Sequence, residues 1–148
     1  MSGCGRMSEW LIDLFIPGTP RAQGSMKHVG RGRMIHEPKL VEWRNWMIES
    51  LQAWVRAHFG GWEPLDEPVE VAASFWLPRP ANPRLEHAAT GLDVDKLQRA
   101  AGDALEKSGV LKNDARIVRW INPEKDWTHD FTGDGSIPGV RLKVRTRS

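Results

Sequence analysis

Along the chain, the spacing of apolar residues switches between the two-residue alternation of a β strand and the three- or four-residue repeat of a helix. The order in which these two patterns follow one another limits the possible folds more than any other feature of the sequence. Helical spacing predicts one helix that begins at Pro38 and is stopped by Gly60–Gly61. It predicts a second helix over about Asp95–Ser108, with Gly109 as its C-terminal cap. Short apolar or alternating runs predict strands at residues 10–16, 34–36, 69–77, 115–121 and 140–144.

Strands and helices that alternate in this way indicate an α/β fold, α+β-like, with a mixed sheet and two main helices packed on it. The length of 148 residues is close to the usual size of one domain. We therefore expect a single domain over residues 1–148, with residues 1–9 as a flexible N-terminal extension. Two segments are expected to be loops: 18–33, rich in glycine and bases, and 78–92, which holds three prolines and has no periodicity.

Positive and negative charges are segregated along the chain. With histidine counted as neutral, residues 21–44 and residues 139–148 each carry a net charge of +4, and residues 45–70 carry −4. The whole chain nevertheless sums to only +2. So small a total excludes a histone-like protein that coats DNA by charge alone. Bases clustered on both sides of an acidic middle are typical of a protein that contacts a polyanion, but a mixed, solvated surface gives the same count.

The number of cysteines and the hydropathy of the sequence indicate the cellular compartment. The single cysteine, Cys4, excludes an internal disulfide framework and indicates reducing surroundings. No apolar run approaches the roughly 20 residues that span a membrane, and the N-terminal residues lack the apolar stretch of a signal peptide. We therefore expect a cytoplasmic protein with no membrane partner.

Three aspartates fall where the chain passes between predicted elements. Asp93 and Asp95 lie two residues apart at the entry to the second helix, and side chains at this spacing point the same way in extended chain. Asp114 lies just before the next strand, so the turn of the chain can return it towards the same end of the sheet. Clustered carboxylates repel one another unless they are protonated or bind a metal, and an all-oxygen set favours Mg²⁺ or Mn²⁺.

Simpler roles explain the same residues. Asp95 could be only an N-cap of the helix, and Asp114 only a turn residue. Arg99 lies four residues after Asp95 on one helix face, where it forms either a surface salt bridge or, with Lys96, a contact to a metal-bound phosphate. The spacing does not separate these interpretations.

The central stretch resembles the signature of the RusA family of Holliday-junction resolvases, particularly its phage-borne members. The residues that carry this resemblance are Asp93-Val94-Asp95-Lys96-Leu97-Gln98-Arg99, Asp103-Ala104-Leu105, Gly109-Val110 and Asn113-Asp114. The opening strand and basic loop of the phage members are matched by Pro17-Gly18-Thr19-Pro20, Gln23-Gly24-Ser25 and Lys27, and Lys125 matches a basic residue after the next strand. The similarity extends from about residue 10 to residue 145.

This resemblance implies a homodimeric, metal-dependent endonuclease that resolves four-way DNA junctions by paired symmetric nicks in recombination and repair. It assigns Asp93, Asp95 and Asp114 as the acidic, metal-binding triad and Arg99 as the basic residue one turn into the helix. Mg²⁺ is the expected cofactor, with Mn²⁺ as the alternative and no small-molecule cofactor, in a bacterial or phage-infected host cell. Lys96 is a further catalytic candidate. The candidate DNA contacts are Arg21, Gln23, Lys27, Arg31, Arg33 and Lys125.

Two positions depart from the family pattern. Asn113 stands where the family often has a second aspartate before the last carboxylate, and an amide oxygen brings no charge, which weakens a second-metal role. Leu92 stands where the residue before the first aspartate is often proline, which affects loop rigidity more than chemistry.

Two other functions fit parts of the pattern. Aspartyl phosphatases and nucleotide-sugar transferases use D-x-D motifs, but they place them after an apolar strand, and residues 86–91 make a poor strand. A non-catalytic DNA- or RNA-binding module would use the basic loops and exposed tryptophans, with Trp62 and Trp127 as the stacking candidates because both are expected in loops. That module leaves the three aspartates unexplained.

Overall fold

The computed structural model describes residues 9–21, 26–28, 34–36 and 38–147. The elements in chain order are β1 (Ile12–Pro17), β2 (Met26–His28), β3 (Met34–His36), α1 (Pro38–His58), β4 (Val69–Leu77), α2 (Val94–Lys107), the 3₁₀ turn η2 (Asp114–Arg116), β5 (Ile117–Trp127) and β6 (Gly139–Thr146). They form a small α+β domain, which confirms the expected fold class. The flexible extension expected at residues 1–9 lies almost entirely outside the described residues.

Four strands form a mixed sheet in the order β1-β6-β4-β5. β6 pairs antiparallel with β1 and β4, whereas β4 pairs parallel with β5. A parallel pair needs a crossover, and α2 supplies it between β4 and β5. The crossover places the N-terminus of α2 after the long loop that leaves β4, and its C-terminus before β5.

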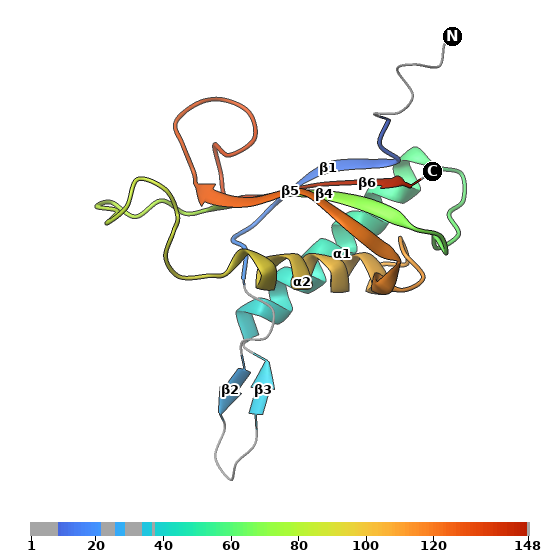
Figure 1. The fold of residues 1–148 in the computed structure, drawn as a ribbon, viewed down its shortest axis with the longest axis horizontal. Helices are drawn as coiled ribbons and strands as arrows, with labels where there is room; N and C mark the ends of the chain where they lie inside the picture. Colours follow the sequence, from blue (N-terminus) through green and yellow to red (C-terminus); the bar gives the residue numbers. More distant parts are fainter. Residues whose placement is uncertain (1–8, 22–25, 29–33, 37, 148) are drawn as a thin grey trace.

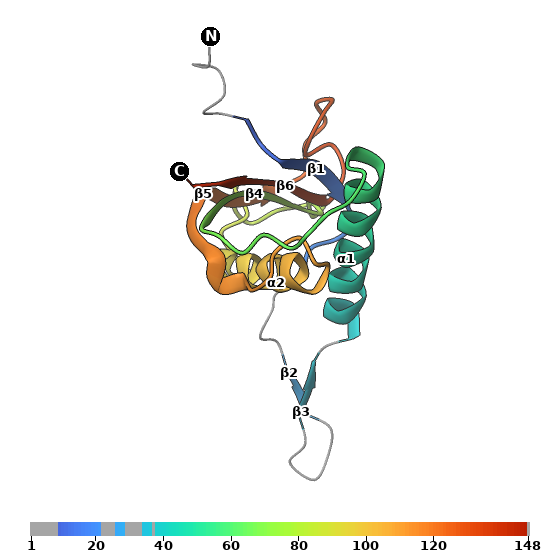
Figure 2. The same cartoon turned by 90° about the vertical axis from the view of Figure 1, so that its right-hand side faces the viewer.

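One face of the sheet packs against both helices and forms the core. Figures 1 and 2 show α2 beneath the sheet and α1 on the same side, next to β1. Alternate residues of the strands are buried towards the helices, as the period-two pattern predicts. On α2 the buried stripe consists mainly of small residues, which lets this helix approach the sheet closely: Leu97, Ala100, Ala101, Gly102, Ala104 and Leu105.

Three boundaries differ from the sequence prediction. The segment expected to be a loop contains β2, which pairs with β3 in a small antiparallel hairpin. α2 begins at Val94, and its C-cap is Ser108, with Gly109 following at φ +86°. β5 begins after η2 and extends to Trp127. Asn122 adopts φ +46° next to a register shift in the β4–β5 pair, and the strand continues beyond this irregularity. Among the described residues, no helix is long and apolar enough to cross a membrane.

Candidate active site

A hollow of about 220 Å³ lies between α2 and the beginning of β5. Its lining contains two of the three predicted aspartates and the predicted arginine, with a floor of apolar side chains from β5. The lining residues are Asp95, Gln98, Arg99, Gly102, Asp114, Ile117 and Trp120. Residues of α2 and of η2 therefore share one surface, and Asp95 and Asp114 of the three predicted aspartates belong to it.

The N-terminus of α2 shows which aspartate caps the helix. The N-cap residue is Asp93, not Asp95, and the Asp93 side chain forms no capping hydrogen bond. Its backbone carbonyl accepts hydrogen bonds from the amides of Lys96 and Leu97 at 3.1 and 3.2 Å. The Asp93 carboxylate instead lies 3.8 Å from the ammonium group of Lys96. The capping explanation therefore does not account for Asp95.

Asp114 is held in place by its neighbours without using its own carboxylate. The Asn113 side-chain oxygen accepts a hydrogen bond from the Ala115 amide at 2.8 Å and so caps η2. The Asp114 amide donates to the Glu106 carboxylate at 2.9 Å. Asn113 is thus the turn residue here, and the Asp114 carboxylate is left for another role.

The three aspartates do not meet at one point. A Cβ placed on Gly102 would lie 4.0 Å from Asp114 Cβ, so Asp114 sits beside the middle of α2. Asp95 lies seven residues before Gly102 on α2, which is about 10 Å along the helix axis. Asp93 is not part of the lining of the hollow. Within the described ranges, no three aspartate, glutamate, histidine or cysteine side chains are grouped so that they could hold a metal ion.

Arg99 faces the same hollow as the two separated carboxylates. Although it lies four residues after Asp95, the structure shows no ion pair between them, and within the described segments neither Asp95 nor Asp114 forms a side-chain hydrogen bond or salt bridge. The surface salt-bridge interpretation of Arg99 is therefore not what the structure shows. Asp103, two turns beyond Asp95, pairs instead with Arg44 at 3.2 Å and so joins the two helices.

Three consecutive residues of β5 hold the loop that leads into α2. Lys125 donates to the Thr90 carbonyl at 3.3 Å, and the Trp127 indole donates to the Leu85 carbonyl at 3.2 Å. Between them, the Asp126 carboxylate accepts hydrogen bonds from the His87 ring at 2.9 Å and from the Ala88 amide at 3.2 Å. The prediction of Lys125 as a DNA contact stays untested by this hydrogen bond, and the sequence does not indicate the role of Asp126, because it does not show which loop a strand residue will face.

The Asp126–His87 pair changes the pKa of both groups. The hydrogen bond to Asp126, and then its charge, raise the pKa of His87 above 6.5. Burial raises the pKa of Asp126, but hydrogen bonds from His87, Trp127 and Ala88 outweigh burial and lower it below 3.8. Both groups are therefore charged in mildly acidic solution, where the loop is held most firmly.

Five of the six predicted DNA contacts belong to the part of the sequence between β1 and α1. Gln23, Arg31 and Arg33 lie outside the described residues, and Lys27 belongs to β2, of which only the backbone is described. Arg21 is partly exposed and lines a separate hollow together with Lys39. These residues stay predicted DNA contacts.

The two tryptophans predicted to stack on bases are engaged within the protein. The Trp62 indole donates to the Val110 carbonyl at 3.2 Å, and its ring packs edge-on against Phe59. Trp127 belongs to β5 rather than to a loop, and it holds Leu85. Both tryptophans thus have structural roles.

The position of the aspartates also distinguishes this site from other D-x-D enzymes. Residues 78–93 form no strand, so Asp93 and Asp95 follow an irregular segment rather than the apolar strand that aspartyl phosphatases and nucleotide-sugar transferases use. The family model described as endodeoxyribonuclease RusA matches residues 17–145. A comparison with curated proteins found no match. Because the match covers nearly the whole chain, this chain belongs to the RusA family of endodeoxyribonucleases, divalent-metal-dependent enzymes that resolve Holliday junctions.

Proposed function

We propose that the hollow between α2 and β5 is the catalytic centre of this junction-resolving endonuclease, and that its metal is Mg²⁺, with Mn²⁺ as the alternative. The observation that carries the proposal is that Asp95, Arg99 and Asp114 line one hollow while both carboxylates lack protein partners in the described part of the chain. Carboxylates that only cap helices or balance nearby bases would have such partners.

The donor set fits a hard divalent cation. Asp95 and Asp114 are exposed, and they offer only carboxylate oxygens, which Mg²⁺ prefers. Mg²⁺ commonly takes one or two carboxylates and completes its shell with water and substrate phosphate, so three converging aspartates are not needed. Asp93 would contribute from the rim of this site, where Lys96 now lies beside it.

The residues of the hollow divide the work of phosphodiester hydrolysis. Asp95 and Asp114 would each offer a carboxylate to a metal ion, directly or through its bound water, and Asp93 would add negative charge nearby. The metal would supply Lewis acidity and a more acidic water. The Arg99 guanidinium faces the same space, where it would bind the scissile phosphate and stabilise the charge that develops on its oxygens. Lys96 would move from Asp93 to the phosphate when DNA binds. The anchored loop before α2 keeps these groups in place.

The biological assembly that we propose is a homodimer acting in the cytoplasm of a bacterial or phage-infected cell. A four-way junction has two-fold symmetry, and a C₂ dimer places one active site on each of two opposed strands, which produces paired nicks. The predicted contacts between β1 and α1 in the sequence would bind the phosphates of the DNA arms: Arg21, Gln23, Lys27, Arg31 and Arg33. Lys125 would act on the loop rather than on DNA directly.

The test compares cutting and binding of a synthetic four-way junction. Asp95→Asn and Asp114→Asn should each reduce cutting in Mg²⁺ by at least about 100-fold. Binding in EDTA should stay the same or tighten, since removing negative charge does not weaken attraction to DNA. Asp130→Asn is the matched control, because Asp130 is an exposed aspartate in the β5–β6 loop outside the hollow. Full cutting by either hollow variant would refute this assignment.

A further inference from the structure

The sheet face that no described helix covers carries a row of bases. Arg141, Lys143 and Arg145 occupy alternate positions of β6, and all three are partly exposed while the intervening residues are buried towards the helices. Residues two apart on a strand are separated by about 6.7 Å. Three cations at this spacing form a line of charge across the open face. Figure 1 shows α2, which lines the catalytic hollow, on the other side of the sheet.

At one end of this row, three arginines surround a single carboxylate. Glu70 is only 7% exposed, and it accepts a hydrogen bond from Arg145 at 2.8 Å. Arg119 and Arg147 lie 3.7 and 3.8 Å from its other oxygen. The hydrogen bond from Arg145 lowers the pKa of Glu70 against the opposing effect of burial, so one negative charge faces three positive ones.

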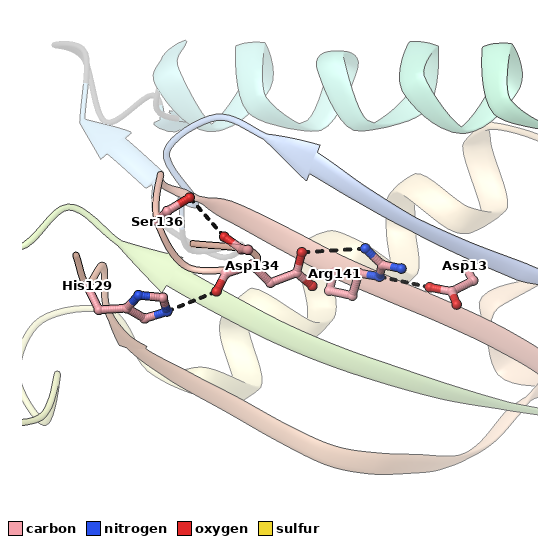
Figure 3. A network of polar contacts seen from close by, with 6 residues as sticks. Asp13, His129, Asp134, Ser136 and Arg141 are labelled. Atoms are coloured by element: carbon pink, nitrogen blue, oxygen red, sulfur yellow. Dashed lines mark hydrogen bonds and ion pairs between the residues drawn. The ribbon is translucent and has the colours of Figure 1, made fainter. Parts of the chain in front are cut away.

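At the other end, Arg141 is fixed by two acids. Its guanidinium lies 2.8 Å from Asp13 and 3.5 Å from Asp134. Figure 3 shows that the two acids contact Arg141 from different sides. The loop that carries Asp134 is held in turn, because the His129 ring contacts the Asp134 carbonyl at 2.9 Å. Lys143, between the two clusters, has no acidic partner among the described residues. The row thus combines fixed geometry with an excess of positive charge.

Between the clusters the sheet surface is hollowed. Ser74 and Ala72 of β4 lie directly opposite Arg141 and Lys143 in the register, and these short side chains leave a hollow of about 440 Å³. Trp10 and Trp76 line it together with Arg141 and Lys143. The Trp10 ring lies 4.4 Å from the guanidinium carbon of Arg145 and 5.8 Å from the Lys143 nitrogen. Aromatic surface, cations and small residues therefore meet in one place.

We propose that this open face is a second DNA-contact surface, which binds a stretch of the sugar–phosphate backbone along β6 and takes an unpaired base into the hollow beside Trp10 and Trp76. The inference rests on the proposed junction-cutting function, and it adds a DNA-binding site that is separate from the catalytic hollow. Guanidinium and ammonium groups bind phosphates, and aromatic side chains stack on unpaired bases.

Charge decides between DNA and a second copy of the chain. A two-fold interface through this face would bring the same patch together with itself. The residues described above comprise five cations and three carboxylates, so the two copies would repel. The same excess of positive charge attracts a polyanion such as DNA.

The experiment measures anisotropy of a labelled four-way junction and of a labelled 20-nucleotide oligo-dT, in EDTA so that no cutting occurs. Lys143→Gln should weaken junction binding about eightfold at 0.1 M salt and reduce the slope of log K against log salt by about 0.9. Lys107→Gln is the control, because Lys107 is an exposed lysine of α2, away from the open sheet face, and its substitution removes the same formal charge. Trp10→Leu should weaken oligo-dT binding about tenfold, and Trp10→Phe should restore most of it.

The outcomes separate this inference from the proposed function. Binding by Lys143→Gln and Trp10→Leu equal to that of the unchanged protein refutes the open-face site, whereas the site assignment at Asp95 and Asp114 is judged by cutting alone. At saturating protein in Mg²⁺, both open-face variants should cut at the unchanged rate, since neither residue lies in the catalytic hollow. If sedimentation shows that these substitutions turn a dimer into monomers, the face is a contact between chains and the DNA inference is wrong.

Discussion

Asp126 is the residue through which β5 controls the loop that leads into the catalytic helix. Its carboxylate accepts hydrogen bonds from the amides of Ala88 and Trp127 at 3.2 and 2.8 Å, and from the His87 ring at 2.9 Å. Asp126→Ala removes all three acceptor contacts and leaves the Ala88 amide without its partner. We expect the loop over residues 78–93 to open more often, while the sheet stays folded because Asp126 is not part of the core.

The size of this effect follows from the hydrogen bonds. The Ala88 amide is the backbone donor that ties the loop to Asp126, and leaving this buried group unpaired costs on the order of 1–3 kcal/mol. The Asp126 side chain is 42% exposed, so water screens part of this cost and a total of about 1–2 kcal/mol is reasonable. That total raises the open population of the loop by about 5- to 30-fold. Asp126→Asn keeps one oxygen acceptor and should give a smaller increase.

The rate of cleavage by trypsin measures how often this loop opens. Arg84 is exposed in the loop and is followed by Leu85, whereas cleavage after Arg79 is blocked by Pro80. The rate of cleavage after Arg84 under native conditions should rise by the same 5- to 30-fold in Asp126→Ala, because it follows the population of the open loop. The midpoint of urea unfolding should change little. An unchanged cleavage rate would show that Asp126 does not hold the loop, and the reasoning would be wrong.

The same assay has a definite pH dependence. The raised pKa of His87 means that its contribution is complete below 6.5 and is lost as pH rises through the raised value. The lowered pKa of Asp126 means that its contribution is present above 3.8 and is lost as pH falls through the lowered value. Cleavage after Arg84, corrected for the pH dependence of trypsin on a peptide, should therefore increase from mildly acidic to alkaline pH. In His87→Ala this increase should disappear.

Three further substitutions test the packing around the site. Leu97→Ala, at a fully buried position of α2, should lower the free energy of unfolding in urea by about 2–5 kcal/mol; a loss under 1 kcal/mol would contradict the packing described. Gly102→Ala should raise Tm by about 2–4 °C, because the new methyl meets only ordinary contacts at 3.6 Å or more and alanine favours a helix by about 1 kcal/mol. Slower cutting by this more stable variant would indicate that substrate needs the space. Gly135→Ala should lower Tm, since Gly135 has φ +93° and its Cβ would collide with the His129 and Trp76 rings, and an unchanged Tm would show that the loop has another conformation.

Periodicity predicted the main elements well because burial acts on every second or every third to fourth residue. Val69, Val71, Ala73 and Phe75 alternate, and they are the residues that β4 buries. The boundaries that failed depend on contacts from elsewhere in the chain. β5 continues past Asn122 because β4 pairs with it on both sides of an irregularity, and that partner is invisible in the local sequence. The β2–β3 hairpin is similar, because each strand has only three residues.

The chemistry of the candidate site was already present in the sequence by itself. Residue types, two-residue spacing and the position at a helix entry singled out Asp93, Asp95, Arg99 and Asp114, because clustered carboxylates repel one another unless they are protonated or bind a metal. The tertiary structure decided which of them share a surface. It places Asp95, Arg99 and Asp114 on one hollow, leaves Asp93 beside Lys96, and uses Asn113 as the cap of η2. It also decided that the basic C-terminal segment is a row on an open sheet face, since only strand pairing determines which side chains the helices cover.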